Sequence, residues 1–130
     1  MTNPEILETR TIRAWLGEDG IMYVETLPGA EINEQAAHAV TDVGIRLAAG
    51  EKRLLCTDAR GMKFITREAR DYLASGIVGA YCLALAILVD SPVNKVLMNF
   101  FITVSRPVFP TRLFTSKAEA LAWLKGTLDR

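Results

Sequence analysis

The chain of 130 residues is half apolar, and its 15 basic residues balance its 15 acidic ones. A chain of this length can bury a substantial hydrophobic core. Because the basic residues do not cluster, the charge pattern gives no support to nucleic-acid binding. We expect a single domain over residues 1–130, with residues 1–9 as a candidate disordered segment.

The apolar stretch Tyr72–Val89 has the length of a short membrane span, but its pattern argues against one. Gly76 and Gly79 interrupt it, and the pattern is that of a helix end followed by a buried strand. The first residues have no apolar segment typical of a secretory signal. Cys56 and Cys82 lie in apolar surroundings and are expected to be reduced core thiols. These features predict a cytoplasmic protein with no membrane span.

The first half of the chain predicts a hairpin, a helix and a strand. The runs Arg10–Leu16 and Ile21–Leu27 flank a Gly-Glu-Asp-Gly turn, which is typical of a β-hairpin. Asn33 is a favourable N-cap for a helix that continues to about Ala49 with an apolar stripe on one side. A short strand follows over Lys52–Asp58.

The second half alternates helices and strands. Thr66 is the expected N-cap of a second helix, and Leu83–Val89 is apolar at every position, as in a strand buried on both faces. Ser91–Ser105 is a third helix with its first residue as N-cap, and Val108–Phe114 is a short edge strand because it contains a proline. A capping box at Ser116 begins the last helix.

This order predicts an α/β fold with an N-terminal hairpin followed by alternating helices and strands. The expected sheet is mostly parallel or mixed, with about five strands and about four helices.

The sequence shows no catalytic or metal-binding pattern. His38 is the single histidine and has no second ligand at metal-binding spacing, so we expect a structural role for it. The nucleophile-elbow, phosphate-loop and dinucleotide-binding motifs are also missing. We therefore expect a protein that is not an enzyme and that uses no metal and no cofactor.

Candidate binding residues follow from their position after the predicted parallel strands, where ligands of open α/β sheets bind. Asp58 and Arg60 follow one strand, and Asp90 and Ser91 follow the next. The helix that begins at Ser91 adds free N–H groups and a partial positive charge. The alternative is structural: Asp58 pairs with Arg60 or Arg67, and Ser91 only caps its helix.

The third helix is apolar on nearly every side, which is typical of a helix buried on more than one side. Either the segment Val108–Phe114 shields it, or it presents a surface for a second subunit, a protein partner or an apolar ligand. We expect Met98, Phe101 or Ile102 to contact a second subunit or an enclosed ligand. Outward-pointing side chains would favour a protein, and a lined cavity would favour a ligand. The expected core stripe is Val93, Val96, Leu97, Phe100, Phe101 and Val104, and the candidate surface comprises Val93, Leu97, Met98, Phe100, Phe101 and Ile102.

Five segments resemble the SpoIIAA-like or STAS-like group, the domains of sulfate transporters and anti-sigma-factor antagonists. The group is structurally related to CRAL-TRIO lipid-binding domains, and the chain is most similar to small uncharacterised bacterial proteins of that fold. The segments are Asp58–Gly61, Glu68–Ala74, Leu83–Pro92, Pro110–Thr115 and Glu119–Leu124.

The resemblance implies a non-enzymatic interaction or regulatory module that forms a homodimer. The alternative that it implies is a small-molecule or lipid-binding domain with an apolar pocket under the third helix. Anti-sigma-factor antagonists are switched by phosphorylation of a serine in a D-S-S-G motif, and the matching place here, Ile65–Ala69, lacks that serine. We expect Thr66 at that place to cap its helix rather than to accept phosphate.

Overall fold

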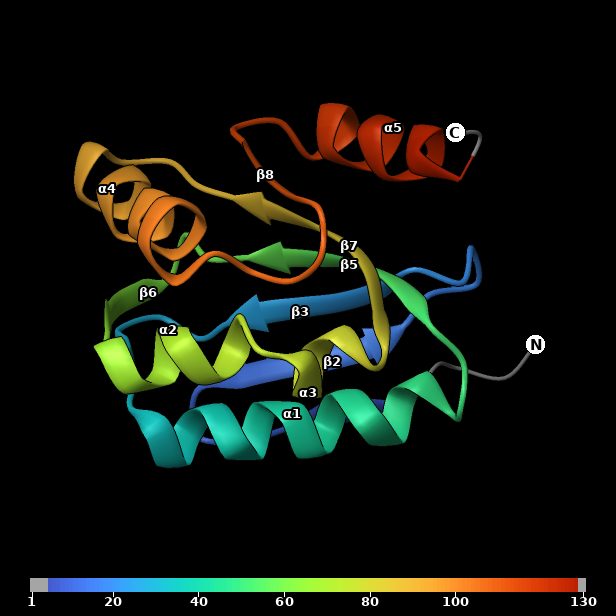
Figure 1. Cartoon of the computed structure of the whole chain (residues 1–130), viewed down its shortest axis with the longest axis horizontal. Helices are drawn as coiled ribbons and strands as arrows, with labels where there is room; N and C mark the ends of the chain where they lie inside the picture. Colours follow the sequence, from blue (N-terminus) through green and yellow to red (C-terminus); the bar gives the residue numbers. More distant parts are fainter. Residues whose placement is uncertain (1–4, 129–130) are drawn as a thin grey trace.

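Short apolar and alternating runs form the strands of two sheets in the computed structural model, which describes residues 5–128 (Figure 1). The larger sheet has six strands in the order β1-β2-β3-β5-β7-β8, and the smaller sheet pairs β4 with β6. The strands are β1 (Ile6–Glu8), β2 (Ile12–Leu16), β3 (Met22–Thr26), β4 (Ala30–Ile32), β5 (Arg53–Asp58), β6 (Met62–Ile65), β7 (Cys82–Leu88) and β8 (Thr111–Phe114).

The helices begin where the sequence places capping residues. The side-chain oxygens of Asn33, Thr66, Ser91 and Ser116 each accept a hydrogen bond from the backbone N–H three residues later, so all four predicted caps are confirmed. The helices are α1 (Glu34–Ala48), α2 (Arg67–Leu73), α3 (Gly76–Gly79), α4 (Pro92–Phe100), the π-helical turn η1 (Phe101–Ser105) and α5 (Lys117–Thr127).

The predicted mixed α/β architecture is confirmed. Strands β2 and β3 form the expected antiparallel hairpin, whereas β3, β5, β7 and β8 pair in parallel. The carboxyl ends of β3, β5 and β7 therefore point to the same side, on the left in Figure 1, where β6 and α4 also lie. Parallel strands need long connections, and here helices supply most of them.

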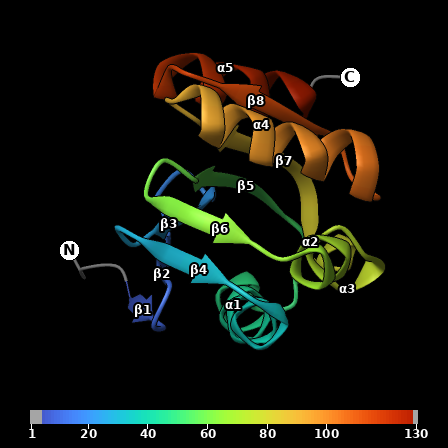
Figure 2. The same cartoon turned by 90° about the vertical axis from the view of Figure 1, so that its left-hand side faces the viewer.

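Two parts of the fold were not expected from the sequence. Residues 6–8, within the candidate disordered segment, form β1, which pairs antiparallel with β2 and places Ile6 opposite Trp15. The expectation of disorder is therefore wrong for these residues, while residues 1–4 lie outside the described part. The second addition is the parallel pair of β4 and β6, which lies beside the carboxyl ends of the main sheet (Figure 2).

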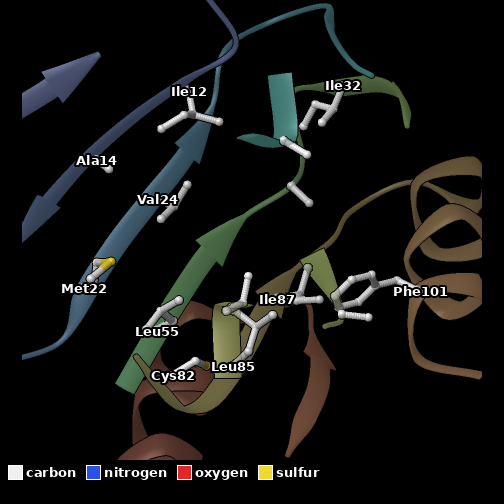
Figure 3. Packing of buried hydrophobic residues seen from close by; sticks show 14 of the residues in the cluster. Ile12, Ala14, Met22, Val24, Ile32, Leu55, Cys82, Leu85, Ile87 and Phe101 are labelled. Carbon is white, nitrogen blue, oxygen red and sulfur yellow. The ribbon is translucent and has the colours of Figure 1, made fainter. Parts of the chain in front are cut away.

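The two faces of the sheet carry separate cores. On one face, buried side chains of the strands pack against α1, α2, α3 and the α4–η1 helix, and Phe101 extends from η1 toward the sheet (Figure 3). On the other face, α5 packs through Ala120 and Leu124 onto β5, β7 and β8. As predicted, Cys56 and Cys82 are free and buried, one in each core.

The apolar stretch Tyr72–Val89 divides between the end of α2, the short helix α3 and the strand β7, which confirms the expected helix end followed by a strand. Among residues 5–128, no helix combines the length and the apolar character needed to cross a membrane.

Two helical glycines have opposite surroundings and give a paired prediction. A Cβ on Gly44 of α1 would collide with the ring and hydroxyl of Tyr81, a buried residue. A Cβ on Gly126 of α5 would meet nothing within 4 Å. We expect Gly44→Ala to lower the free energy of unfolding by about 1–3 kcal/mol. Gly126→Ala should raise it by up to about 1 kcal/mol, because alanine has the higher helix propensity.

Urea unfolding followed by circular dichroism measures both changes. Equal effects of the two substitutions would show that Tyr81 yields to the added methyl group, contrary to the packing described here.

Candidate functional site

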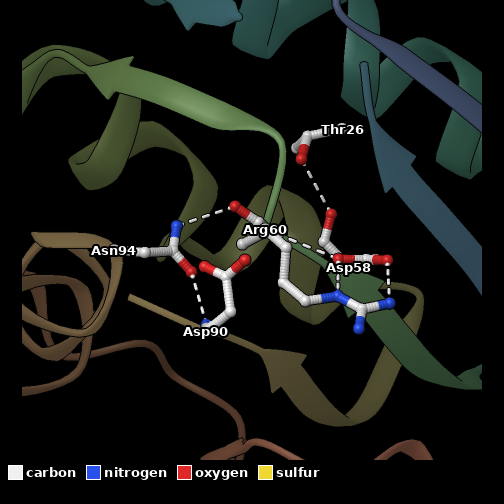
Figure 4. A network of polar contacts seen from close by, with 6 residues as sticks. Thr26, Asp58, Arg60, Asp90 and Asn94 are labelled. Carbon is white, nitrogen blue, oxygen red and sulfur yellow. Dashed lines mark hydrogen bonds and ion pairs between the residues drawn. The ribbon is translucent and has the colours of Figure 1, made fainter. Parts of the chain in front are cut away.

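The parallel pairing of β5 with β7 brings the predicted polar residues of the two strand ends together. Asp58 lies opposite Leu88 in the register, and the N–H of Ala59 donates to the Leu88 carbonyl oxygen at 3.0 Å. Asp58 and Arg60 therefore lie beside Asp90 (Figure 4). The expected convergence of these residues at one edge of the sheet is present.

Asp58 and Arg60 form a two-pronged ion pair. The Arg60 Nε and Nη2 atoms donate to the two Asp58 carboxylate oxygens at 2.9 and 2.7 Å, and the Arg60 backbone N–H donates to Oδ1 at 3.0 Å. Burial by itself would raise the pKa of Asp58, but these hydrogen bonds and the Arg60 charge outweigh it, and the pKa lies below its usual value. The pair orders the turn that follows β5.

Asn94 connects this turn to α4, and it is the polar residue that the sequence did not single out. Its side chain is 3% exposed, its amide donates to the Ala59 carbonyl oxygen at 2.8 Å, and its carbonyl oxygen accepts from the Asp90 N–H at 3.3 Å. Buried backbone groups need such partners. The Asn94 bridge therefore fixes the start of α4 to the carboxyl ends of β5 and β7.

The side chains of Asp90 and Ser91, the two residues before α4, cap the start of this helix. The Ser91 hydroxyl accepts from the Asn94 N–H at 3.1 Å, and the Asp90 carboxylate accepts from the Ser91 N–H at 2.6 Å. Two of the N–H groups that could hold a bound anion are thus occupied from within the chain.

The α4–η1 helix buries a different side from the one expected. Asn94, Met98 and Phe101 are buried, and Leu97 and Ile102 are partly buried. The predicted core stripe is wrong at four positions, because these apolar side chains lie on the exposed side. They are Val93 (69% exposed), Val96 (56%), Phe100 (46%) and Val104 (57%), which we call the outer stripe.

More cationic than acidic groups lie beside the outer stripe. No acidic residue lies within α4 or η1, whose one charged side chain is Lys95. The Arg70 guanidinium of α2 lies 5.6 Å from the centre of the Phe100 ring. An open groove of about 500 Å³ adjoins the stripe at Val96, and its charged lining residues are Lys95, Arg112 and Glu119. The face is therefore apolar with a net positive rim.

The inner side of the same helix lines a space in the core. Met98 and Phe101 contribute to the wall of an apolar cavity between the sheet and the helices, while Phe100 lies outside it. The same helix therefore has one side at the protein surface and the other side at the cavity, instead of only one of the two. Phe100 belongs to the surface, and Met98 and Phe101 belong to the cavity.

The other titratable candidates have structural surroundings. The His38 ring stacks on Tyr72 at 4.0 Å, and its Nε2 lies 3.7 Å from Glu34. Burial raises the pKa of Cys56 to about 11 and that of Cys82 to about 12, so both are protonated thiols and weak nucleophiles at neutral pH. In the described part of the chain, no three His, Cys, Asp or Glu side chains are grouped as metal ligands would be.

Comparisons with known proteins give a family and a fold. The family model of a domain of unknown function, DUF7793, matches residues 14–128. A crystal structure of an uncharacterised protein of the DUF3478 family from Shewanella loihica PV-4, with a SpoIIAA-like fold, is similar with a TM-score of 0.60 and 14% sequence identity. The similarity covers 94% of this chain and 92% of that one, and it shows the fold. A comparison with curated proteins finds no match.

We predict that the Asn94 bridge is a large contributor to stability. Asn94→Ala removes the hydrogen bond to the Asp90 N–H and one of the two bonds to the Ala59 carbonyl oxygen, which also accepts from the Met62 N–H at 3.1 Å, and we expect it to lower the free energy of unfolding by about 1–3 kcal/mol. Asn99→Ala is the matched control, because Asn99 lies on the exposed side of the same helix and should change stability by less than about 0.5 kcal/mol. Chemical unfolding measures both, and equal losses would contradict the bridge.

The Asp58–Arg60 pair predicts a pH dependence of stability. Because the pKa of Asp58 is lowered in the folded chain, the pair stabilises the fold above the unfolded pKa of about 3.9 and loses that contribution as the pH falls through the folded pKa. At pH 7 the contribution should be no more than about 1 kcal/mol, since Arg60 is half exposed.

Unfolding of the wild type and Asp58→Asn between pH 7 and pH 2.5 measures this contribution. The difference in stability should be constant above about pH 5 and shrink below about pH 4. Arg60→Gln should reproduce it, whereas a difference that grows on acidification would contradict the direction of the pKa shift.

Proposed function

The chain belongs to the DUF7793 family and has the SpoIIAA-like fold, and we propose that it is a non-enzymatic interaction module that docks a protein partner on the α4–η1 helix. The observation that carries the proposal is the outer stripe. Four large apolar side chains follow one side of a helix and remain about half exposed or more. Contiguous exposed apolar surface is typical of a binding site, whereas scattered exposed residues are not.

The size of the stripe favours a transient complex over a permanent one. A stable interface involves about 20–30 residues on each side. Complete burial of each stripe residue would contribute about 1.5–3 kcal/mol, and these side chains are already partly buried. The gain is comparable with the free-energy cost of association, so the stripe alone supports binding that forms and dissociates readily. Such binding suits a regulatory module.

The charge around the stripe favours a partner with acidic residues. Lys95 lies on the helix, Arg70 lies beside Phe100, and Arg112 lines the groove at Val96 together with the one acidic residue there, Glu119, so the net charge beside the stripe is positive. An amphipathic segment with an apolar stripe and acidic flanks would match this surface in both respects. A second copy of the chain would place two surfaces of net positive charge against each other. The resemblance implies a homodimer, so a second copy of the chain on the same stripe is the alternative to be tested.

The proposal places the module in the cytoplasm and gives it no phosphorylation switch. Two buried free thiols are typical of proteins in a reducing compartment. The Thr66 hydroxyl accepts from the Ala69 N–H at 3.1 Å, so it supports α2 at the position where the resemblance implies a phosphorylated serine. Control of this module would then come from the availability of its partner.

Designed peptides can test the chemistry of the partner. We expect a fluorescein-labelled amphipathic helix with leucine at i, i+3 and i+7 and glutamate flanks to bind with a dissociation constant of about 10 µM or weaker. Val96→Ser and Phe100→Ser should each weaken binding by roughly tenfold or more, because each removes apolar contact area. Fluorescence anisotropy measures the affinity, and circular dichroism should show that both variants remain folded.

Two matched controls make this test selective. Ile45→Ser changes an equally exposed apolar residue on α1 and should leave the peptide affinity unchanged. The same peptide with lysine flanks should bind much more weakly, because its charges repel the cationic rim. Equal binding of both peptides would overturn the proposed partner. Light scattering that shows a dimer dissociated by Val96→Ser would identify a second copy as the occupant instead.

A further inference from the structure

Strand β8 is the last strand of the six-stranded sheet, and β7 is its single neighbour there. Two N–H groups of β7 and the residue after it donate to the carbonyl oxygens of Pro110 and Phe114, at 2.8 and 2.9 Å. The backbone groups of a strand point alternately to its two sides, so the N–H and carbonyl groups of Thr111 and Leu113 point away from β7. They form an outer edge of unpaired backbone groups.

The usual protections of an edge strand do not block this edge. Proline and charged side chains are common protections. Pro110 directs its backbone toward β7, so its missing N–H is on the paired side of the strand. The Arg112 guanidinium lies 5.3 Å from the centre of the Phe114 ring, which packs on the α5 side of the sheet. The outer edge of β8 therefore remains open to a further strand.

The open groove of about 500 Å³ lies beside this edge, between α4 and α5 (Figure 2). Residues 112–115 line it from β8 and the following turn, Lys95, Val96 and Asn99 from α4, and Glu119 from α5. The volume is within the range of about 300–1,000 Å³ that is typical of binding pockets. Since β8 has four residues, its edge is about 13 Å long and matches a partner strand of four or five residues.

The charges of the groove favour an acidic partner. Lys95 and Arg112 outnumber Glu119 among its charged lining residues. Among residues 5–128, neither cation forms an ion pair with a carboxylate of the chain. A second copy that paired its own β8 with this one would bring like charges together across the two strands, which is destabilising. A strand from a different protein, with an acidic side chain, fits better.

We propose that the outer edge of β8 binds an extended peptide segment of a partner protein, which adds to the sheet as a further strand. Its backbone pairs with Thr111 and Leu113, and an acidic side chain lies near Lys95 and Arg112. In strand addition the main-chain hydrogen bonds provide affinity, and pockets for alternate side chains provide specificity. Val96 borders both this groove and the outer stripe, but the proposal does not rest on a helix docked on the stripe.

A capped, fluorescein-labelled peptide, Thr-Val-Glu-Val-Thr, is the probe. We expect fluorescence anisotropy to give a dissociation constant of roughly 100 µM to 1 mM, because the contact is small. N-methylation of alternate amides, in two complementary sets, tests the pairing, because only every second N–H of an added strand faces β8. One set should weaken binding by roughly tenfold and the other by less than about twofold. Lysine in place of glutamate should weaken it by roughly threefold or more.

Two substitutions at one position test the edge from the side of the protein. Thr111→Pro removes an outward N–H and should weaken the peptide by roughly threefold to tenfold. Thr111→Ala is the matched control, because it keeps that N–H and loses the same hydroxyl bond to the Phe109 carbonyl oxygen. Proline is tolerated at the first residue of a strand, so both variants should fold. Phe100→Ser, outside the groove, should leave this affinity unchanged, which separates the edge from the helix-docking stripe.

Amide hydrogen exchange gives a readout that needs no variant. The N–H groups of Thr111 and Leu113 should exchange rapidly in the free protein and become protected with saturating peptide, whereas the N–H of Phe114, which faces β7, should be protected in both states. Unchanged exchange at Thr111 and Leu113 would overturn the proposal. So would equal effects of the two methylated sets, equal binding of the lysine peptide, a folded Thr111→Pro variant that binds as the wild type does, or a dimer that Thr111→Pro dissociates in light scattering.

Discussion

Two backbone groups at the carboxyl ends of β5 and β7 meet at the side chain of Asn94. Its amide binds the Ala59 carbonyl oxygen and its own carbonyl oxygen binds the Asp90 N–H, so both ends of one carboxamide are satisfied. The orientation of α4 depends on this bridge, because Asn94 can stay buried only while both partners are in place. Once Asn94 points inward, Met98 and Phe101 follow it one and two turns later. The outer stripe lies outside for the same reason.

The sequence predicted the helices better than the short strands. Capping residues such as Asn33 and Ser91 act locally, through the N–H group three residues later, so their effect is visible without tertiary contacts. Strands β4 and β6 could not be recognised in this way. Ala30–Ile32 has three residues, too few for its alternating burial to be recognised from the sequence, and the burial of Met62–Ile65 does not alternate. Their pairing joins segments about 30 residues apart in the chain.

The sequence also failed to predict which side of α4 packs against the core. Hydrophobic periodicity identified α4 as a helix but gave it the wrong rotation, because apolar residues occupy both sides and the buried position of Asn94 is polar. A buried polar residue needs groups that it can bind, and those of Asn94 belong to the turn after β5 and to the loop after β7. The sequence did predict that Asp58 and Asp90 lie close together, because adjacent parallel strands end at the same edge of a sheet. The sequence could only suggest a cavity as one alternative, because the volume of a cavity depends on side chains from several strands and helices.

The α4–η1 helix is a wall of the core on one side and an outer surface on the other. Met98 and Val96 are two residues apart, yet one lines the cavity and the other faces outward. A shift of this helix therefore alters both surfaces together. The Asn94 bridge holds one end of this helix, and Phe101 holds the other against the sheet. The outer stripe is therefore presented on an element whose position is set by the core, and substitutions that loosen the inner side would also displace the surface that we propose binds a protein.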